Sequence, residues 1–299
     1  MRAKVIERRS FAKINLCLEL LGERADGYVE IRTIFQTIAL ADRIVFEEAP
    51  AGVLEVLCDD PSIPSGEGNL VWRAARLLLA ETGVAKGARV RLSKVIPSGA
   101  GLGGGSGNGA VALVTLNRMW GLGLDGERLH RLAARLGSDV PFFLYGGTAL
   151  GLGRGEEVYP LPDFPACGVV VALPPFRIAT PDVYRAARPL LTPRSGGHTI
   201  WRFAPGSVAG GVDYSCVINE LEPAAAQGHP ALTLIRRRLV ELGAAASALC
   251  GSGSAVFGLF TGEAEGAAYV LAREDPGLTV FTTRTLEGRS YREAIYGGS

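Results

Sequence analysis

The feature that most constrains this chain is a glycine-rich segment at residues 97–110, with the sequence PSGAGLGGGSGNGA and seven glycines. Apolar residues alternate through residues 89–96, which predicts a strand, and residues 110–120 predict a largely apolar helix. Glycine adopts positive φ angles, so several backbone N–H groups of such a loop can converge on an anion. The following helix adds the free N–H groups of its first turn. The sequence therefore predicts a phosphate-binding unit, with a flexible turn as the alternative.

Two common phosphate-binding loops are disfavoured by the residues around this segment. The Walker motif needs a lysine and a serine or threonine directly after its last glycine, and neither follows here. Gly99, Gly101 and Gly104 satisfy G-x-G-x-x-G, but a dinucleotide site also requires a second strand that ends in an acidic residue about twenty positions on. Only residues 121–124 separate the predicted helix from Asp125, so no strand fits between them. A P-loop is therefore excluded and a Rossmann loop is not expected.

The composition indicates a globular chain that meets anionic ligands locally. With 299 residues, 47% of them hydrophobic, it can form one domain or two closely joined domains. A net charge of +1 argues against nucleic acid as a partner, because basic excess is the usual mark of backbone binding. The five cysteines are scattered without a C-x-x-C pair, which favours reduced thiols over disulfides or zinc. Neither a signal peptide nor a membrane-length apolar run is evident, so we expect a cytoplasmic protein that binds no membrane.

Strand and helix patterns alternate along the chain, which predicts an α+β fold. Residues 69–82 have the spacing of an amphipathic helix with Asn69 as N-cap and Gly83 as C-cap, and residues 127–136 repeat the pattern. The second half predicts further strands and helices at residues 168–173, 231–242, 255–260, 264–274 and 279–285.

A turn-rich stretch at residues 153–165 is the best candidate for a domain boundary. We therefore expect an N-terminal domain at residues 1–157 and a C-terminal domain at residues 158–299. Residues 194–211 are rich in glycine, serine and proline and predict a long loop.

Three motifs resemble the GHMP kinase superfamily, a group of small-molecule kinases. The glycine-rich segment is similar to its second motif, P-x-x-x-G-L-G-G-G-S-x-N-x-A; residues 11–16 (FAKINL) are similar to its first, and residues 249–257 (LCGSGSAVF) to its third. The three lie in the superfamily's order and span nearly the whole chain. The resemblance implies a two-domain GHMP kinase fold with the active site in the interdomain cleft, and phosphoryl transfer from ATP to a small-molecule substrate.

Further residues resemble one branch of the superfamily. They are AKINL at 12–16, RADGY at 24–28, the triple glycine before Ser106, and LGSDVPF at 136–142. This branch phosphorylates the 2-hydroxyl of a methylerythritol that carries a cytidine diphosphate, in non-mevalonate isoprenoid precursor biosynthesis, and the resemblance implies that activity here. A superfamily kinase of another small alcohol and a non-catalytic ligand sensor on the same fold are the alternatives.

ATP is expected at the glycine-rich segment. Mg²⁺ would accompany it, and Ser106 is the candidate hydroxyl for the metal, which needs few protein oxygens. The branch usually has a second serine where this chain has Gly107, so phosphate contacts would rely on Ser106 and on backbone N–H groups. The expected ATP-binding residues are Asn69, Pro97, Ser98, Gly99, Ala100, Gly101, Leu102, Gly103, Gly104, Gly105, Ser106 and Gly107.

Lys13 and Asp139 are the candidate catalytic residues. Strict alternation along residues 12–20 places Lys13 and Asn15 on one face of a strand and Leu18 on the other. In the superfamily the lysine that matches Lys13 sits beside the reacting hydroxyl, and the acid that matches Asp139 is the general base. An ordinary solvated face is the alternative for Lys13. Asp139 is also well placed to cap a following helix with Pro141 in its first turn, so a structural role is its alternative.

The substrate site departs from the branch's pattern at one position. The branch usually has D-G-Y-H, whose tyrosine and histidine bind cytosine, but here Tyr28 is followed by Val29. Tyr28 can still stack on a pyrimidine, whereas the valine side chain cannot hydrogen-bond the base, so backbone groups or another residue must take over. Thr180 and Tyr184 resemble the branch's residues that close over the cytidine. The expected substrate-binding residues are Asn15, Tyr28, Val29, Thr180, Tyr184, Gly251 and Ser252.

Overall fold

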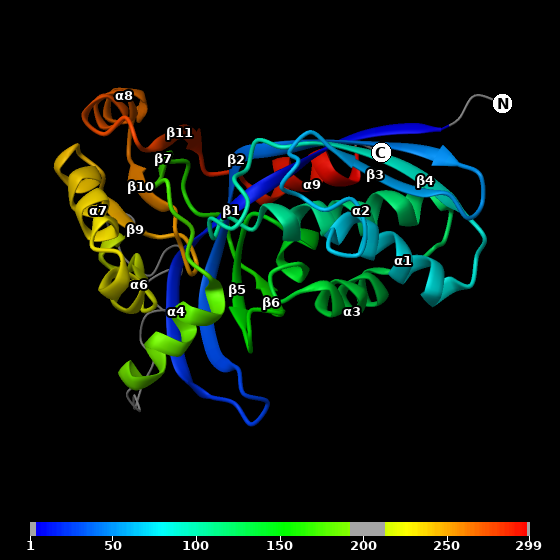
Figure 1. The fold of residues 1–299 in the computed structure, drawn as a ribbon, viewed down its shortest axis with the longest axis horizontal. Helices are drawn as coiled ribbons and strands as arrows, with labels where there is room; N and C mark the ends of the chain where they lie inside the picture. Colours follow the sequence, from blue (N-terminus) through cyan, green and yellow to red (C-terminus); the bar gives the residue numbers. More distant parts are fainter. Residues whose placement is uncertain (1–3, 192–212, 298–299) are drawn as a thin grey trace.

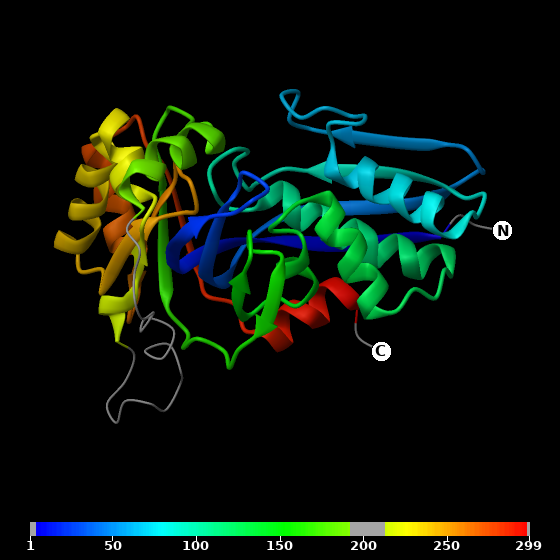
Figure 2. The same ribbon diagram turned by 90° about the horizontal axis from the view of Figure 1, so that it is seen from below.

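Two sheets and their helices build the molecule. The structure is a computed structural model, and it describes residues 4–191 and 213–297. The smaller sheet stands at one end with helices on its outer side, and the larger sheet runs from it to the other end (Figures 1 and 2). The long loop predicted at 194–211 lies outside the described residues.

The larger sheet has seven strands and is built around one long antiparallel hairpin. Its central path is β3-β4-β2-β1-β8, and β5 pairs with β2 and β6. Residues 10–20 of β1 are buried without interruption, because the strand is covered on both faces and each face needs apolar side chains. The strands are β1 (Val5–Glu23), β2 (Val29–Ala49), β3 (Leu54–Cys58), β4 (Gly87–Ser93), β5 (Thr148–Leu152), β6 (Glu157–Pro160) and β8 (Ile218–Asn219).

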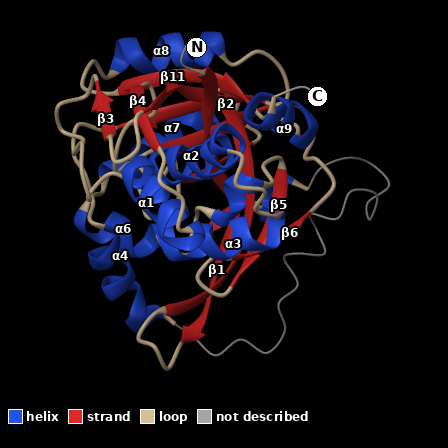
Figure 3. Ribbon diagram, turned by 90° about the vertical axis from the view of Figure 1, so that its right-hand side faces the viewer, coloured by secondary structure: helices blue, strands red, loops and turns tan. Residues whose placement is uncertain are grey.

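Helices α1, α2, α3 and α9 form the first core with this sheet, and Figure 3 shows them gathered beside β2, β3 and β4. Helix α2 is buried on nearly all sides, as its apolar sequence predicts. The predicted caps of α1 are confirmed, since the Asn69 side chain accepts from Val71 N and Gly83 is left-handed. The elements are α1 (Leu70–Thr82), α2 (Gly104–Trp120), α3 (Gly126–Leu136), the 3₁₀ helix η1 (Pro141–Leu144) and α9 (Gly288–Tyr296).

The smaller sheet is antiparallel in the order β11-β7-β10-β9. Its strands and helices confirm the elements predicted for the second half to within one residue at each end. The strands are β7 (Gly168–Leu173), β9 (Ala246–Leu249), β10 (Val256–Phe260) and β11 (Thr279–Arg284). The helices are α4 (Thr180–Ala187), η2 (Arg188–Leu190), η3 (Tyr214–Cys216), α6 (Glu222–Gly228), α7 (Ala231–Glu241) and α8 (Glu265–Glu274). Within the described residues, no helix has the length and apolar character needed to span a membrane.

The chain passes between the two sheets more than once. Strand β6 spans the expected boundary at 157–158 and pairs with β5 in the larger sheet. Strand β8 joins β1, and α9 returns to the first core through Tyr291 and Ile295. The two structural bodies are therefore not two continuous halves of the sequence, and the exact domain limits remain a prediction.

Two element boundaries near the glycine-rich segment were predicted wrongly. Helix α2 begins at Gly104, not at residue 110, because its glycines lie where a side chain has no room: a Cβ on Gly104 would lie 2.8 Å from Ile96 Cγ2, and one on Gly107 2.9 Å from Ser10 Oγ. Close packing thus outweighs the low helix propensity of glycine. Strand β4 ends at Ser93, before the predicted residue 96, because the N–H groups of Val95 and Ile96 donate to the buried Asp42 carboxylate.

Candidate active site

A pocket of about 570 Å³ lies where the two sheets meet, and it gathers predicted residues from distant parts of the chain. Strands β1 and β2, the glycine-rich segment, α4 and the turn before β10 all contribute to its wall. The predicted site residues that line it are Lys13, Asn15, Tyr28, Val29, Gly101, Gly103, Ser106, Asp139, Thr180, Tyr184, Gly251 and Ser252.

Lys13 and Asp139 meet inside this pocket. Lys13 Nζ lies 3.2 Å from Asp139 Oδ2 and donates to Asn15 Oδ1 at 2.8 Å. Asn15 Nδ2 in turn donates to Thr33 Oγ1 at 2.7 Å. Lys13 is 3% exposed, so the solvated face considered for it is wrong, whereas the Asp139 side chain is 32% exposed to the pocket. A buried ammonium with fixed partners thus orients a carboxylate that a substrate can reach.

Asp139 does not cap the element that follows it. That element is the short 3₁₀ helix η1, its N-cap position is Val140, and no side chain caps it. The capping role considered for Asp139 is therefore wrong. Its carboxylate turns instead towards Lys13 on β1.

A β-bulge in β1 changes which side chains face the pocket. The register with β2 shifts between Asn15 and Cys17, so Leu16 has no partner residue. Leu18 consequently lines the pocket together with Lys13 and Asn15, while Cys17 packs in the core with Ile14. The strict alternation predicted along residues 12–20 holds up to Asn15 and is wrong beyond it.

The glycine-rich segment brings the start of helix α2 to the pocket. Gly101 and Gly103 have φ of +79° and +70°, and a Cβ on Gly101 would lie 1.8 Å from the Cys250 carbonyl oxygen. Gly103 is the N-cap residue of α2 and has no side chain to accept from the first turn. The free N–H groups of that turn are therefore available beside Ser106. A helix N-terminus of this kind attracts anions through its dipole and its donors.

The other expected ATP-binding residues do not line the pocket. Ala100 and Leu102 belong to the buried core, and Gly104 and Gly107 are buried within α2. Pro97, Ser98, Gly99 and Gly105 lie along the same segment outside it. Asn69 caps α1 with its oxygen and donates from Nδ2 to the Pro64 carbonyl at 2.9 Å, so its amide already has partners. The ATP-binding roles of these residues remain predictions.

A buried polar cluster beneath the glycine-rich segment was missed by the sequence analysis. Asp42 on β2 pairs with Lys94 and accepts from Asn108 Nδ2 at 2.9 Å, and Asn108 also donates to Ser10 Oγ at 3.0 Å. This cluster ties β1, β2 and the end of β4 to helix α2. An acidic residue inside an otherwise apolar stretch of β2 was the available signal.

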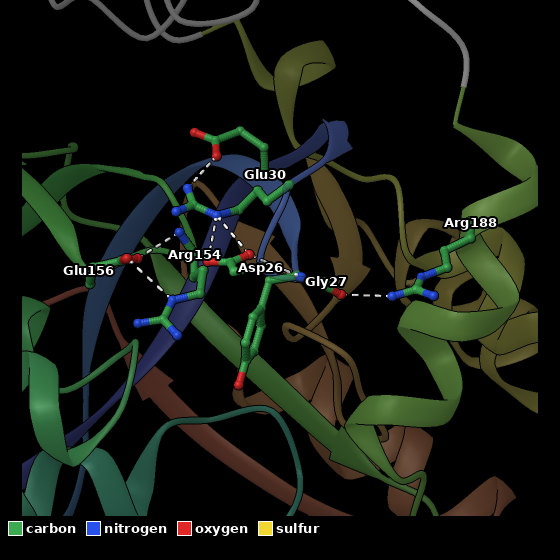
Figure 4. A network of polar contacts seen from close by, with 8 residues as sticks. Asp26, Gly27, Glu30, Arg154, Glu156 and Arg188 are labelled. Carbon is green, nitrogen blue, oxygen red and sulfur yellow. Dashed lines mark hydrogen bonds and ion pairs between the residues drawn. The ribbon is translucent and has the colours of Figure 1, made fainter.

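The far end of the pocket is formed by the tip of the β1–β2 hairpin, the turn between β5 and β6, and α4. Tyr28 is 55% exposed, and the guanidinium carbon of Arg154 lies 4.8 Å from its ring centroid. In Figure 4, Glu156 holds Arg154, and Arg188 reaches Gly27 from the other side. Arg154 was also missed, because nothing in residues 153–156 indicates that they meet residue 28.

Val29, Tyr184 and Thr180 complete this end. Val29 is 5% exposed and packs in the second apolar cluster with Leu18. Thr180 and Ser252 share a hydrogen bond of 2.7 Å between their hydroxyls, which joins α4 to the glycine turn before β10. Burial, with a smaller effect from the charge of Asp139, raises the pKa of the Tyr184 phenol. That phenol therefore stays protonated at ordinary pH.

Comparison with known proteins shows which family this chain belongs to. The models for the N-terminal and C-terminal domains of GHMP kinases match residues 69–147 and 207–275. A 4-diphosphocytidyl-2-C-methyl-D-erythritol kinase from Pelotomaculum thermopropionicum is 43% identical over 287 residues, which is 95% of this chain and 99% of that protein. The chain belongs to this kinase family.

Solved structures agree on the architecture. A crystal structure of a 4-(cytidine 5'-diphospho)-2C-methyl-D-erythritol kinase aligns with a TM-score of 0.80 and 37% identity, over 95% of this chain and all of that one. A homoserine kinase from Cytophaga hutchinsonii aligns with a TM-score of 0.67 and 21% identity, over 95% and 96% of the two chains. The predicted α+β GHMP kinase fold is thus confirmed, and the second likeness supports the fold alone.

Proposed function

We propose that this protein transfers the γ-phosphoryl group of ATP to the 2-hydroxyl of 4-diphosphocytidyl-2-C-methyl-D-erythritol. The observation that carries the proposal is that the Lys13–Asp139 pair shares one pocket with Tyr28 and Tyr184. One end of the pocket offers a carboxylate held by a cation, and the other offers aromatic rings suited to a base. The family relatives act, by their names, on this substrate.

ATP would place its phosphates at the N-terminus of helix α2. Phosphoryl transfer asks a protein chiefly for positioning and for charge stabilisation. The uncapped first turn of α2 offers backbone donors, and Gly101 and Gly103 allow close approach of the backbone. These features support the expectation that the glycine-rich segment binds ATP.

Asp139 would accept the proton of the substrate hydroxyl. The hydroxyl oxygen would then attack the γ-phosphorus of ATP as ADP leaves. Lys13 lies 3.2 Å from that carboxylate, so it would hold the carboxylate in place and stabilise negative charge on the attacking oxygen. Asn15 and Thr33 keep the ammonium in one position through their hydrogen bonds.

Mg²⁺ fits this site as part of the bound nucleotide. Among the described residues, no group of three or more His, Cys, Asp or Glu side chains is arranged to hold a metal ion. Mg²⁺ keeps several waters and binds chiefly to phosphate oxygens, so the Ser106 hydroxyl at the start of α2 suffices as a protein ligand. When bound, the ion would neutralise charge on the phosphates.

Tyr28 and Tyr184 would hold the cytosine, and Val29 raises a second candidate function. The Val29 side chain has no donor or acceptor atom and packs among apolar side chains, so it gives the base no hydrogen bond. A related kinase that acts on another small alcohol is therefore the second candidate. A non-catalytic sensor is disfavoured, because the lysine, the carboxylate and the phosphate loop are all in place.

ADP formation with and without the diphosphocytidyl substrate separates these candidates. We expect ATP turnover that depends on 4-diphosphocytidyl-2-C-methyl-D-erythritol. Turnover with mevalonate or homoserine, and none with the cytidine compound, would favour the second candidate. Binding of the cytidine compound without any turnover would favour the sensor.

We also propose that the protein works in a reducing compartment such as the cytoplasm. None of the five cysteines forms a disulfide, and four of them are buried. Burial raises the pKa of the Cys250 thiol to about 12, so this neighbour of the pocket stays protonated and unreactive.

A further inference from the structure

Arg154 lies in the turn between β5 and β6 and lines the pocket, although the mechanism above does not use it. We propose that its guanidinium binds the diphosphate of the nucleotide substrate and so determines specificity for it. This inference rests on the proposed function, because it takes the diphosphocytidyl compound as the substrate.

The stem of Arg154 is fixed before any ligand binds. Its backbone N–H donates to Glu156 Oε2 at 2.6 Å and its Nε to Glu156 Oε1 at 3.3 Å, as Figure 4 shows. The same turn is tied to β2, because Ile31 N donates to the Gly153 carbonyl at 2.7 Å. Two anchors on one short turn leave the guanidinium little freedom to lose on binding.

The end of the side chain is open. Within the part of the chain that the structure describes, Arg154 Nη1 and Nη2 have no hydrogen-bond partner, and the side chain is 31% exposed. The two amino groups form a planar fork of donors, which matches the spacing of phosphate oxygens. The Tyr28 ring supports the fork from one side.

The position of Arg154 agrees with the order of groups along the substrate. In that molecule the diphosphate joins the cytidine to the alcohol, so it must lie between the base site and the reacting hydroxyl. The turn that carries Arg154 spans the two sites: a Cβ on Gly155 would lie 3.7 Å from Asp139 Oδ1, and the Arg154 guanidinium lies over Tyr28. The fork therefore stands beside the base site, on the turn that continues towards Asp139, which is where we expect the diphosphate to lie.

The other cations of the pocket are engaged elsewhere. Lys13 is bound by Asn15 and Asp139. Arg188 pairs with Glu23 and donates to the Gly27 carbonyl. Arg185 pairs with Asp182 and is largely exposed at the rim. A diphosphate that leaves water needs donors in exchange, and Arg154 offers its two amino groups inside the pocket rather than at the rim.

Competitive binding of cytidine, CMP and CDP to Arg154→Met tests this role. Methionine keeps an apolar stem against Tyr28 but removes the charge and the fork. We expect roughly tenfold or greater loss of affinity for CDP, the factor typical of a lost hydrogen bond to a charged group. Cytidine should bind within about twofold of the parent, since it has no phosphate. The KM for the diphosphocytidyl substrate should rise by about the same factor as the affinity for CDP falls, while kcat and the KM for ATP stay unchanged.

Two further variants keep the result interpretable. Arg154→Lys should recover part of the CDP affinity, because it restores the charge without the fork. Arg289→Met removes the charge of an exposed arginine on α9, outside the pocket, and should bind all three ligands like the parent. An equal loss for cytidine and CDP, or no loss for either, in folded Arg154→Met would overturn the proposal. If the parent protein turns over the diphosphocytidyl substrate in the kinetic assay, the proposed function stands whatever the variant shows. If the parent protein neither binds CDP nor turns over the substrate, both proposals are wrong.

Discussion

The two ends of the pocket are built in opposite ways. At the Lys13 end the polar side chains are buried and linked in a row, Lys13 to Asn15 to Thr33, on two central strands. At the Tyr28 end the hairpin tip, with Tyr28 itself, is exposed and is held by ion pairs on the surface, such as Arg24 with Asp26, although Val29 below it is buried. Buried hydrogen-bonded groups keep one geometry, whereas exposed ion pairs contribute little and can adjust. The first end suits chemistry, and the second suits recognition that can change between relatives.

The largest effect should come from Asp139→Asn, which tests the chemical end. Asparagine keeps the shape and can still accept from Lys13, but it cannot take a proton as a carboxylate does. We expect kcat to fall roughly 10²-fold or more, with thermal stability and ATP affinity nearly unchanged. Steady-state kinetics with a melting curve checks this.

Asp125→Asn is the matched control for that substitution. Asp125 caps α3 by accepting from Arg128 N at 2.8 Å, and asparagine caps about as well as aspartate. The control variant should keep parental kinetics. Parental kcat in folded Asp139→Asn would remove the general base from the account.

An intermediate effect should follow Tyr28→Ala, which tests the recognition end. Loss of one base stack costs on the order of 1–3 kcal/mol, so the KM for the nucleotide substrate should rise roughly five- to 150-fold. The KM for ATP and kcat should change little, and Tyr28→Phe should retain the ring contact. Tyr159→Ala removes another exposed tyrosine, from β6, and serves as the control. Equal rises in both KM values would show that the two ends are not separate.

A smaller effect is expected from Gly105→Val, which tests the ATP side alone. A Cβ at Gly105 meets only Leu70 Cδ1 at 3.8 Å, so the folded protein has room for it. A branched side chain there would keep ATP phosphates from the first turn of α2, and we expect the KM for ATP to rise about tenfold, as for one lost hydrogen bond to a charged group. Gly126→Val, at the start of α3 in open space, is the control. An unchanged KM for ATP would place the nucleotide elsewhere.

The sequence predicted the features that depend on short spacings within single helices and strands. The caps of α1, three of the four strands of the smaller sheet (β7, β10 and β11) and the shared face of Lys13 and Asn15 follow from short spacings, whereas β9 was not predicted. The glycine-rich segment predicts phosphate binding from its own residues, and that role stays a prediction.

The features that the sequence analysis missed depend on contacts between distant segments. The bulge at Leu16 arises from the register between β1 and β2, and it turns Leu18 towards the pocket. Helix α2 starts early because Ile96 and Ser10 pack against its glycines. Arg154 meets Tyr28 only because β5 pairs with β2, which brings its turn to the hairpin tip. None of these contacts has a local pattern.

The central claim is that Lys13 and Asp139 act together on one transition state at the buried end of the pocket. Single-turnover rates of Lys13→Met, Asp139→Asn and the double variant, with both substrates saturating, test it most directly. We expect the single-turnover rate of each single variant to fall roughly 10²-fold or more. The double variant should be slower than the slower single variant by less than about threefold, because the effects of groups that act as a unit are strongly non-additive. Losses that multiply in the double variant would show that the two residues act independently and would contradict the account.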